Sequence, residues 1–126
     1  MSKDNVRILI LEDDEERVSA FRRRYPQAVI VKSATDCIKL LSEEWDLVYL
    51  DHDLGTATFG TTKREDCGYE IVRHIQEHKP ENLKPTEFVV HSSNPVGAKR
   101  MIDDLGRAGY NATHVPFTEL LRTFGA

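Results

Sequence analysis

Short apolar runs and amphipathic stretches alternate along the chain. Most runs are rich in branched residues and are followed by polar residues, a pattern typical of strands buried in a parallel sheet. The stretches between the runs carry apolar residues at helical spacing. The runs predict strands at residues 6–11, 28–31, 46–51, 88–92 and 113–117. The stretches predict helices from Asp14 to before Pro26, from a cap at Thr35 or Asp36, over residues 68–78, from Asn94-Pro95 to Gly106 or Gly109, and over residues 118–124.

Residues suited to capping stand at several of these helix starts. Asp14 is expected to cap the first helix, and Asn94 followed by Pro95 places a cap and a first-turn proline in their preferred positions. The second helix is expected to bury three residues on its inner face, Ile38, Leu41 and Trp45.

The five alternations of strand and helix contain no repeat and no low-complexity linker. This order favours an α/β fold, a doubly wound parallel sheet with helices on both faces. A length of 126 residues suits a single domain over residues 1–126. In such sheets, ligands bind beyond the carboxyl ends of the strands.

The acidic residues are concentrated rather than spread. The chain carries 17 Lys and Arg against 21 Asp and Glu, a net charge of −4, and seven of those acids lie at residues 12–16, 51 and 53. The rest of the chain is mildly basic. Such a focus suits a bound cation, and it argues against a broad nucleic-acid-binding surface, which would be positive.

The sequence also indicates a compartment. No apolar run approaches the roughly 20 residues that span a bilayer, and the first residues lack the hydrophobic stretch of a signal peptide. Cys37 and Cys67 form no CxxC pattern; we expect Cys37 in the core and Cys67 to be inert. A cytoplasmic protein with no membrane partner is therefore expected.

Polar residues able to do chemistry follow three of the predicted strands, in the segments 12–14, 51–53 and 91–94. This pattern resembles the receiver domains of response regulators. It consists of two acids after the first strand, Asp51 at the end of the third strand and Ser92 at the end of the fourth. The resemblance implies that Glu12 and Asp13 hold magnesium, that Asp51 accepts a phosphoryl group and that Ser92 contacts it.

The receiver fold is flavodoxin-like and implies the strand order 2-1-3-4-5. That order places the first, third and fourth strands side by side. Neighbouring strands lie about 4.8 Å apart, so the three polar strand ends would converge within roughly 10 Å. Carboxylate oxygens gathered there would suit Mg²⁺ or Mn²⁺.

Several departures from receivers point to a more distant relative. Val115 stands where receivers carry a lysine, two histidines flank the site, and the last helix is short. The segments Asp51–Gly55 and His91–Asn94 are similar to the cyclic-phosphate processing receiver domain family. This resemblance implies a protein that processes phosphoester ends, cyclic phosphates in particular, instead of relaying a signal. The expected substrate is a phosphorylated or cyclic-phosphate small molecule or RNA end.

The hypothesis divides the site into three sets of residues. Hard carboxylate ligands would come from Asp13, Asp51, Glu12 and Asp53. Because imidazole titrates near neutrality, His52 and His91 would form the acid–base pair beside Asp51. Phosphate oxygens would be held by Ser92 and Asn94 and by Lys63 and Arg64. Lys63 and Arg64 belong to the segment Leu54–Asp66, whose length is typical of lids and binding loops.

Each of these residues also has a structural interpretation, which the sequence leaves open. Glu12 and Asp13 can complement a helix dipole, Asp51 can merely end its strand, and His91 can be a core histidine. His52 can be an exposed loop residue, and Asp53 can start a turn. Ser92 and Asn94 can serve only as turn and cap residues, and Lys63 and Arg64 can be solvated. The alternative function is a degenerate receiver, phosphorylated on Asp51 or acting as a signalling or interaction module. A signalling or RNA-processing protein partner fits either function.

Overall fold

The computed structural model describes residues 6–52 and 68–124. Within these residues the strands are β1 (Ile8–Leu11), β2 (Val29–Val31), β3 (Leu47–Leu50), β4 (Glu87–Val90) and β5 (Asn111–His114). The helices are α1 (Glu15–Arg24), α2 (Ala34–Leu40), α3 (Tyr69–His78), the short 3-10 helix η3 (Glu81–Leu83), α4 (Pro95–Arg107) and α5 (Phe117–Thr123).

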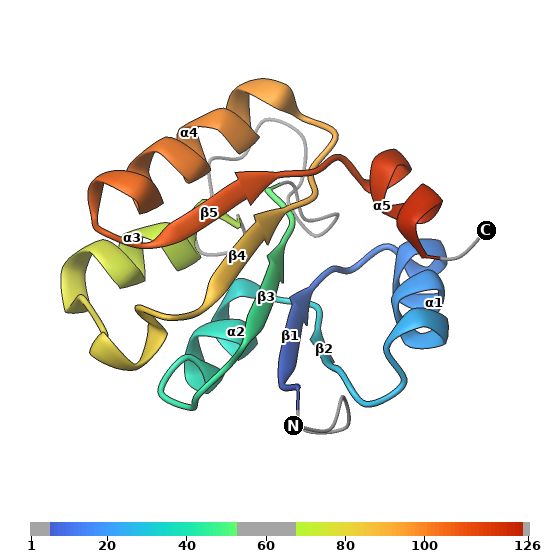
Figure 1. Cartoon of the computed structure of the whole chain (residues 1–126), viewed down its shortest axis with the longest axis horizontal. Coiled ribbons are helices and arrows are strands. Elements are labelled where there is room, and N and C mark those ends of the chain that lie inside the picture. Colours follow the sequence, from blue (N-terminus) through green and yellow to red (C-terminus); the bar gives the residue numbers. More distant parts are fainter. Residues whose placement is uncertain (1–5, 53–67, 125–126) are drawn as a thin grey trace.

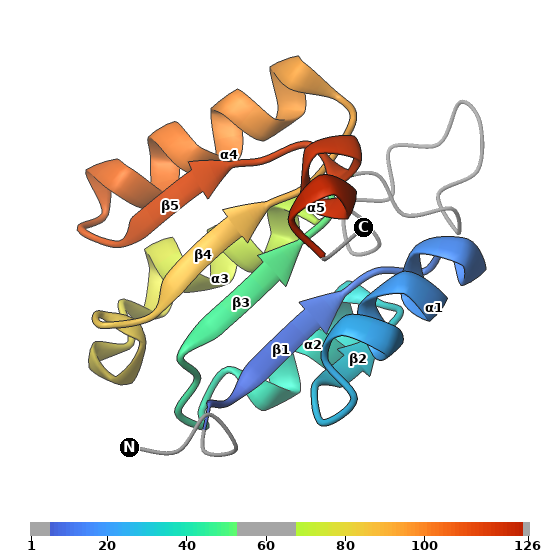
Figure 2. The ribbon, with the colours of Figure 1, turned by 45° about the vertical axis from the view of Figure 1, so that its right-hand side comes forward.

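The strands form one parallel sheet in the order β2-β1-β3-β4-β5, which confirms the predicted topology (Figure 1). Helices α1 and α5 cover one face, and α2, α3 and α4 cover the other (Figure 2). The apolar core therefore has two parts. The cluster under α1 and α5 is formed by Ile8, Ile10, Ala20, Phe21, Tyr49, Phe117 and Leu120. In the part of the chain that the structure describes, no helix has the length and apolar character needed to cross a membrane.

Two predicted caps are confirmed, and both lie at the edge where the strands end. The Asp14 carboxylate accepts the Arg17 N–H at 3.0 Å, at the start of α1. The Asn94 side-chain oxygen accepts the Gly97 N–H at 3.0 Å, and Pro95 occupies the first turn of α4. These bonds satisfy helix N–H groups that have no partner within the helix.

Three predictions about local structure were wrong. The cap of α2 is Ser33, not Thr35 or Asp36, because its hydroxyl accepts the Asp36 N–H at 3.1 Å. Helix α2 ends at Leu40, so Trp45 is not part of it. The Trp45 indole is nevertheless buried, and its N–H donates to the Leu40 carbonyl at 2.7 Å.

The third error concerns the last strand, β5, which begins and ends earlier than the predicted segment 113–117. It is an edge strand that pairs only with β4, and its residues are exposed or half-buried. Asn111 and Ala112 lack the branched apolar side chains that mark a buried strand, so its start was missed.

Helix α3 starts in direct contact with the end of β3. The Gly68 N–H donates to the His52 carbonyl at 2.8 Å. A Cβ atom at Gly68 would lie 1.7 Å from the Asp51 carbonyl oxygen, so only glycine allows this approach. The position of Asp51 is thereby tied to the position of α3.

Candidate functional site

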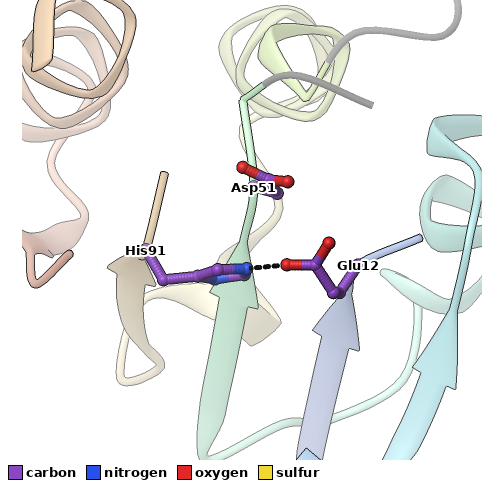
Figure 3. Close-up of side chains that lie close together, drawn as sticks. All are labelled: Glu12, Asp51 and His91. Atoms are coloured by element: carbon purple, nitrogen blue, oxygen red, sulfur yellow. Dashed lines mark hydrogen bonds and ion pairs between the residues drawn. The ribbon is translucent and has the colours of Figure 1, made fainter. Parts of the chain in front are cut away.

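Glu12, Asp51 and His91 occupy equivalent positions on three neighbouring strands. Each is the first residue after its strand, and the sheet register aligns the preceding residues, Leu11 with Leu50 and Leu50 with Val90. Glu12 and His91 reach toward each other across the end of β3, and Asp51 lies beyond them (Figure 3). One potential ligand atom from each residue lies within 4.8 Å of the others.

Glu12 is fully buried, yet its carboxylate is well provided with hydrogen bonds. One oxygen, Oε2, accepts the N–H groups of Asp13 and Asp14, both at 3.0 Å. The other, Oε1, lies 2.8 Å from His91 Nε2 and 3.7 Å from the Arg17 guanidinium. Burial by itself raises the pKa of Glu12, but the bonds from His91 and Asp14 and the charge of Arg17 together hold this pKa below its usual value. Glu12 is therefore ionised.

His91 is a buried histidine with an aromatic environment. Its ring packs against Phe21, Tyr49 and Phe117, with centroid separations of 5.2, 6.2 and 6.3 Å. Burial lowers the pKa of His91 below its usual value, so the ring is neutral. We assign its proton to Nε2, because the Glu12 carboxylate can only accept. The other nitrogen, Nδ1, has no hydrogen-bond partner among the described residues.

A cleft of about 590 Å³ opens beside this cluster. It is lined by Glu12, Asp13, Asp14, Glu15, Glu16, Arg17, Asp51, Ser92 and Ser93. Asp13 is half-buried and Asp51 is only 4% exposed. The Asp51 carboxylate accepts its neighbour's amide, His52 N–H, at 2.9 Å. Carboxylates of this kind are the ligands that hard divalent cations prefer, so the donor set fits Mg²⁺ or Mn²⁺.

Only some of the predicted site residues line the cleft. Glu12, Asp13, Asp51 and Ser92 contribute to it, whereas His91 does not. His91 lies behind Glu12 and reaches the cleft only through that carboxylate. The acid–base role of His91 remains a prediction. In the structure, the most direct effect of His91 is to position the Glu12 carboxylate.

The loop after β4 is fixed by hydrogen bonds at Ser92. The Ser92 hydroxyl accepts the Asn94 N–H at 3.0 Å, and the Ser92 carbonyl accepts from His114 Nε2 at 2.9 Å. The hydroxyl hydrogen of Ser92 can still be donated to a ligand. Asn94 uses its side-chain oxygen to cap α4 and does not line the cleft, so its phosphate contact remains a prediction.

His52 is half-buried and lies against the start of α4. A Cβ atom at Gly97 would come within 2.7 Å of the His52 ring, so the glycine makes room for this histidine. His52 is not among the residues that line the cleft. At the end of β5, Val115 packs in the cluster under α1 and α5, on the face opposite to His114.

The remaining predicted residues, Asp53, Lys63 and Arg64, lie outside the described residues, as does the segment Leu54–Asp66. Their roles in metal and phosphate binding stay predictions.

Sequence reasoning missed two residues of the site. Arg17 lines the cleft, and His114 holds the Ser92 carbonyl. A signal existed for Arg17, since it follows the cap Asp14 by three residues and must lie on the first turn of α1, near the strand ends. No comparable signal marks His114, because its contact depends on the register between β4 and β5.

Comparisons with known proteins identify the family and the fold of the chain. Residues 8–107 match the family model described as the cyclic-phosphate processing receiver domain. No curated protein matches the chain. Among solved structures, the Mn²⁺-bound form of the response regulator Rcp1 is similar with a TM-score of 0.65 and 14% identity, over 94% of this chain and 88% of that chain.

Two further solved structures are similar. A response regulator from Colwellia psychrerythraea has a TM-score of 0.62 and 16% identity, over 94% of this chain and 93% of that chain. A response regulator protein from Burkholderia pseudomallei, with a phosphorylated aspartic acid, a calcium ion and citrate, has a TM-score of 0.55 and 13% identity, over 89% of this chain and 61% of that chain. At these identities the likeness shows a shared fold.

Proposed function

The chain belongs to the cyclic-phosphate processing receiver domain family, and from this premise we propose that its cleft binds a divalent cation and hydrolyses a cyclic or terminal phosphoester. The observation that carries the proposal is the convergence of the Glu12, Asp13 and Asp51 carboxylates on a cleft that Ser92 also lines. The substrate would be a nucleotide or an RNA end.

The cation, Mg²⁺ or Mn²⁺, would be held chiefly by Asp13 and Asp51. Glu12 has less to offer, since three of its roughly four lone-pair positions accept hydrogen bonds from His91, Asp13 and Asp14. When bound, the cation would neutralise charge on the phosphate oxygens. The Mn²⁺-bound form of the similarly folded Rcp1 supports a divalent ion in this fold.

In the proposed hydrolysis of a cyclic phosphate, water adds to phosphorus and one ring P–O bond breaks, which leaves a phosphate monoester and a hydroxyl. Water loses one proton to a base, and the leaving oxygen gains one. We assign phosphate contact to the Ser92 hydroxyl and proton transfer to His52, which follows Asp51 in the chain and whose ring, packed against the start of α4, would have to turn toward the cleft. His91 would act as a positioning residue, because its bond to Glu12 fixes that carboxylate at the cleft.

The proposal is tested by incubating the purified protein with Mg²⁺ or Mn²⁺ and a panel of 2′,3′-cyclic mononucleotides, cyclic oligonucleotides and cyclic-ended RNA. We expect turnover that is lost with a chelator and in Asp51→Asn. Asp103→Asn is the matched control, since Asp103 is paired with Lys99 on the surface of α4. The absence of turnover on the whole panel would reject the proposal.

A second candidate is supported by the presence of both Asp51 and Ser92 in the lining of the cleft. In this case Asp51 would accept a phosphoryl group, as an aspartic acid does in the similarly folded response regulator from Burkholderia pseudomallei. Incubation with a small phosphodonor would then give an acid-stable, base-labile adduct that is lost in Asp51→Asn. His52→Ala separates the candidates, because it should abolish esterase activity and leave formation of the adduct intact.

A further inference from the structure

The cleft is strongly acidic for a site that takes an anionic phosphoester. Six of the residues that line it are carboxylates, and Arg17 is the one cationic side chain among the described residues of the lining. Val115, at the end of β5, is packed in an apolar cluster and supplies no charge. A phosphate group entering this cleft would need a positive partner besides the metal ion, since like charges close together repel.

Arg17 is held at the cleft by contacts with two other segments of the chain. One terminal nitrogen of its guanidinium donates to the Ser93 hydroxyl at 3.1 Å, in the loop after β4. The guanidinium also lies 5.0 Å from the centre of the Phe117 ring, at the start of α5. The side chain is 27% exposed. Contacts on several sides fix a long side chain that would otherwise move freely, so the charge is placed before a ligand arrives.

The contacts leave Arg17 with hydrogen-bonding capacity. A guanidinium has five N–H donors, and the bond to Ser93 uses one of them. The nitrogen nearest to Glu12 is 3.7 Å from Oε1, an ion pair that is longer than a hydrogen bond. Glu12 already accepts from His91 and from two amides, so its charge is satisfied without a close contact from Arg17.

We propose that Arg17 is a substrate-binding residue, whose guanidinium donates to the non-bridging oxygens of the phosphoester. This inference rests on the proposed function, and it names the group that binds the anionic part of the substrate. The planar fork of arginine matches two phosphate oxygens, which a lysine ammonium cannot do in the same way.

The test measures the binding of inorganic phosphate by calorimetry in saturating Mg²⁺, and the binding of Mn²⁺ without phosphate. Arg17→Gln should weaken phosphate binding by about tenfold to a hundredfold, the range for a hydrogen bond to a charged group. The phosphate affinity of Arg17→Lys should lie between those of Arg17→Gln and the unaltered chain, because lysine keeps the positive charge but lacks the planar guanidinium. Arg22→Gln, an exposed position on the same helix, should bind phosphate as the unaltered chain does. Mn²⁺ should bind Arg17→Gln at least as tightly as it binds the unaltered chain, since a neighbouring positive charge has been removed.

Equal phosphate affinity in Arg17→Gln and the unaltered chain would overturn the inference. So would a parallel loss of phosphate and Mn²⁺ affinity, which indicates a structural role, or the absence of phosphate binding by the unaltered chain. If Arg17→Gln does not fold, the Nε–H resonance of Arg17 decides: it should shift during a phosphate titration, and an unchanged resonance overturns the inference.

Measuring phosphoester hydrolysis by the unaltered chain and by Arg17→Gln distinguishes this inference from the proposed function. Phosphate binding that depends on Arg17 without any turnover supports the inference and rejects the hydrolase. Turnover that is unchanged in Arg17→Gln supports the hydrolase and overturns the inference.

Discussion

The buried bond between Glu12 and His91 makes these two residues energetically dependent on each other, which a double-mutant cycle can measure. Glu12→Ala leaves the Nε2–H of His91 without an acceptor in a fully buried position. An unpaired buried donor costs about 1–3 kcal/mol. The amides of Asp13 and Asp14 also lose an acceptor, but water can reach them, so each adds at most about 1 kcal/mol. We therefore expect Glu12→Ala to lower the free energy of unfolding by about 1–5 kcal/mol.

The second change is His91→Phe, which keeps an aromatic ring among Phe21, Tyr49 and Phe117 and removes both ring nitrogens. In the unaltered chain, this change deprives the Glu12 carboxylate of a buried donor. In Glu12→Ala, it instead removes the orphaned donor and should restore stability. The two changes should therefore be non-additive by about 1–3 kcal/mol.

The assay is urea denaturation followed by the fluorescence of the single tryptophan, Trp45, with a chelator present so that metal binding does not contribute. Glu12→Ala combined with Tyr110→Phe is the control, because Tyr110 precedes β5 at the other end of the sheet, and those two changes should add. Additivity of Glu12→Ala and His91→Phe within about 0.5 kcal/mol would refute the coupling.

Two further predictions concern packing and titration. Gly68→Ala should lower the free energy of unfolding by about 1–3 kcal/mol or more, since the new Cβ meets the Asp51 carbonyl, whereas Gly106→Ala, with open space around it, should not destabilise; equal effects in urea denaturation would contradict this. Burial raises the pKa of the Cys37 thiol from 9.0 to about 12. In Cys67→Ser, iodoacetamide at pH 8 should therefore label Cys37 only after unfolding, and labelling of the folded chain would contradict its burial. Because the unfolded thiol ionises first, Cys37 should also lower stability as the pH rises from 9 toward 12, a loss absent in Cys37→Ala.

The convergence of Glu12, Asp13 and Asp51 could be predicted because parallel strands end at one edge and the motifs implied which strands are neighbours. The environment of His91 could not. Its burial depends on Phe21 and Phe117, which come from α1 and α5 at opposite ends of the chain. Both the catalytic and the core interpretation of His91 therefore fitted the sequence.

The role of Arg17 at the cleft could not be predicted from the sequence either. An arginine on the first turn of a helix is ordinarily solvated, and only the contacts with Ser93 and Phe117 bring its charge to the cleft. Trp45 shows how spacing can mislead, because it keeps the helical period of Ile38 and Leu41 although α2 has already ended at Leu40. Its burial is real, but it is set by tertiary packing.

The central claim, that the strand ends form a cation site, is tested most directly by titrating Mn²⁺ into the ¹⁵N-labelled protein and following paramagnetic broadening of the amide signals. We predict saturable broadening centred on Asp13, Asp51 and Ser92, which Mg²⁺ reverses and which is strongly weakened in Asp51→Asn. Broadening spread over the exposed acids of the surface, with no saturation and no effect of Asp51→Asn, would contradict the account.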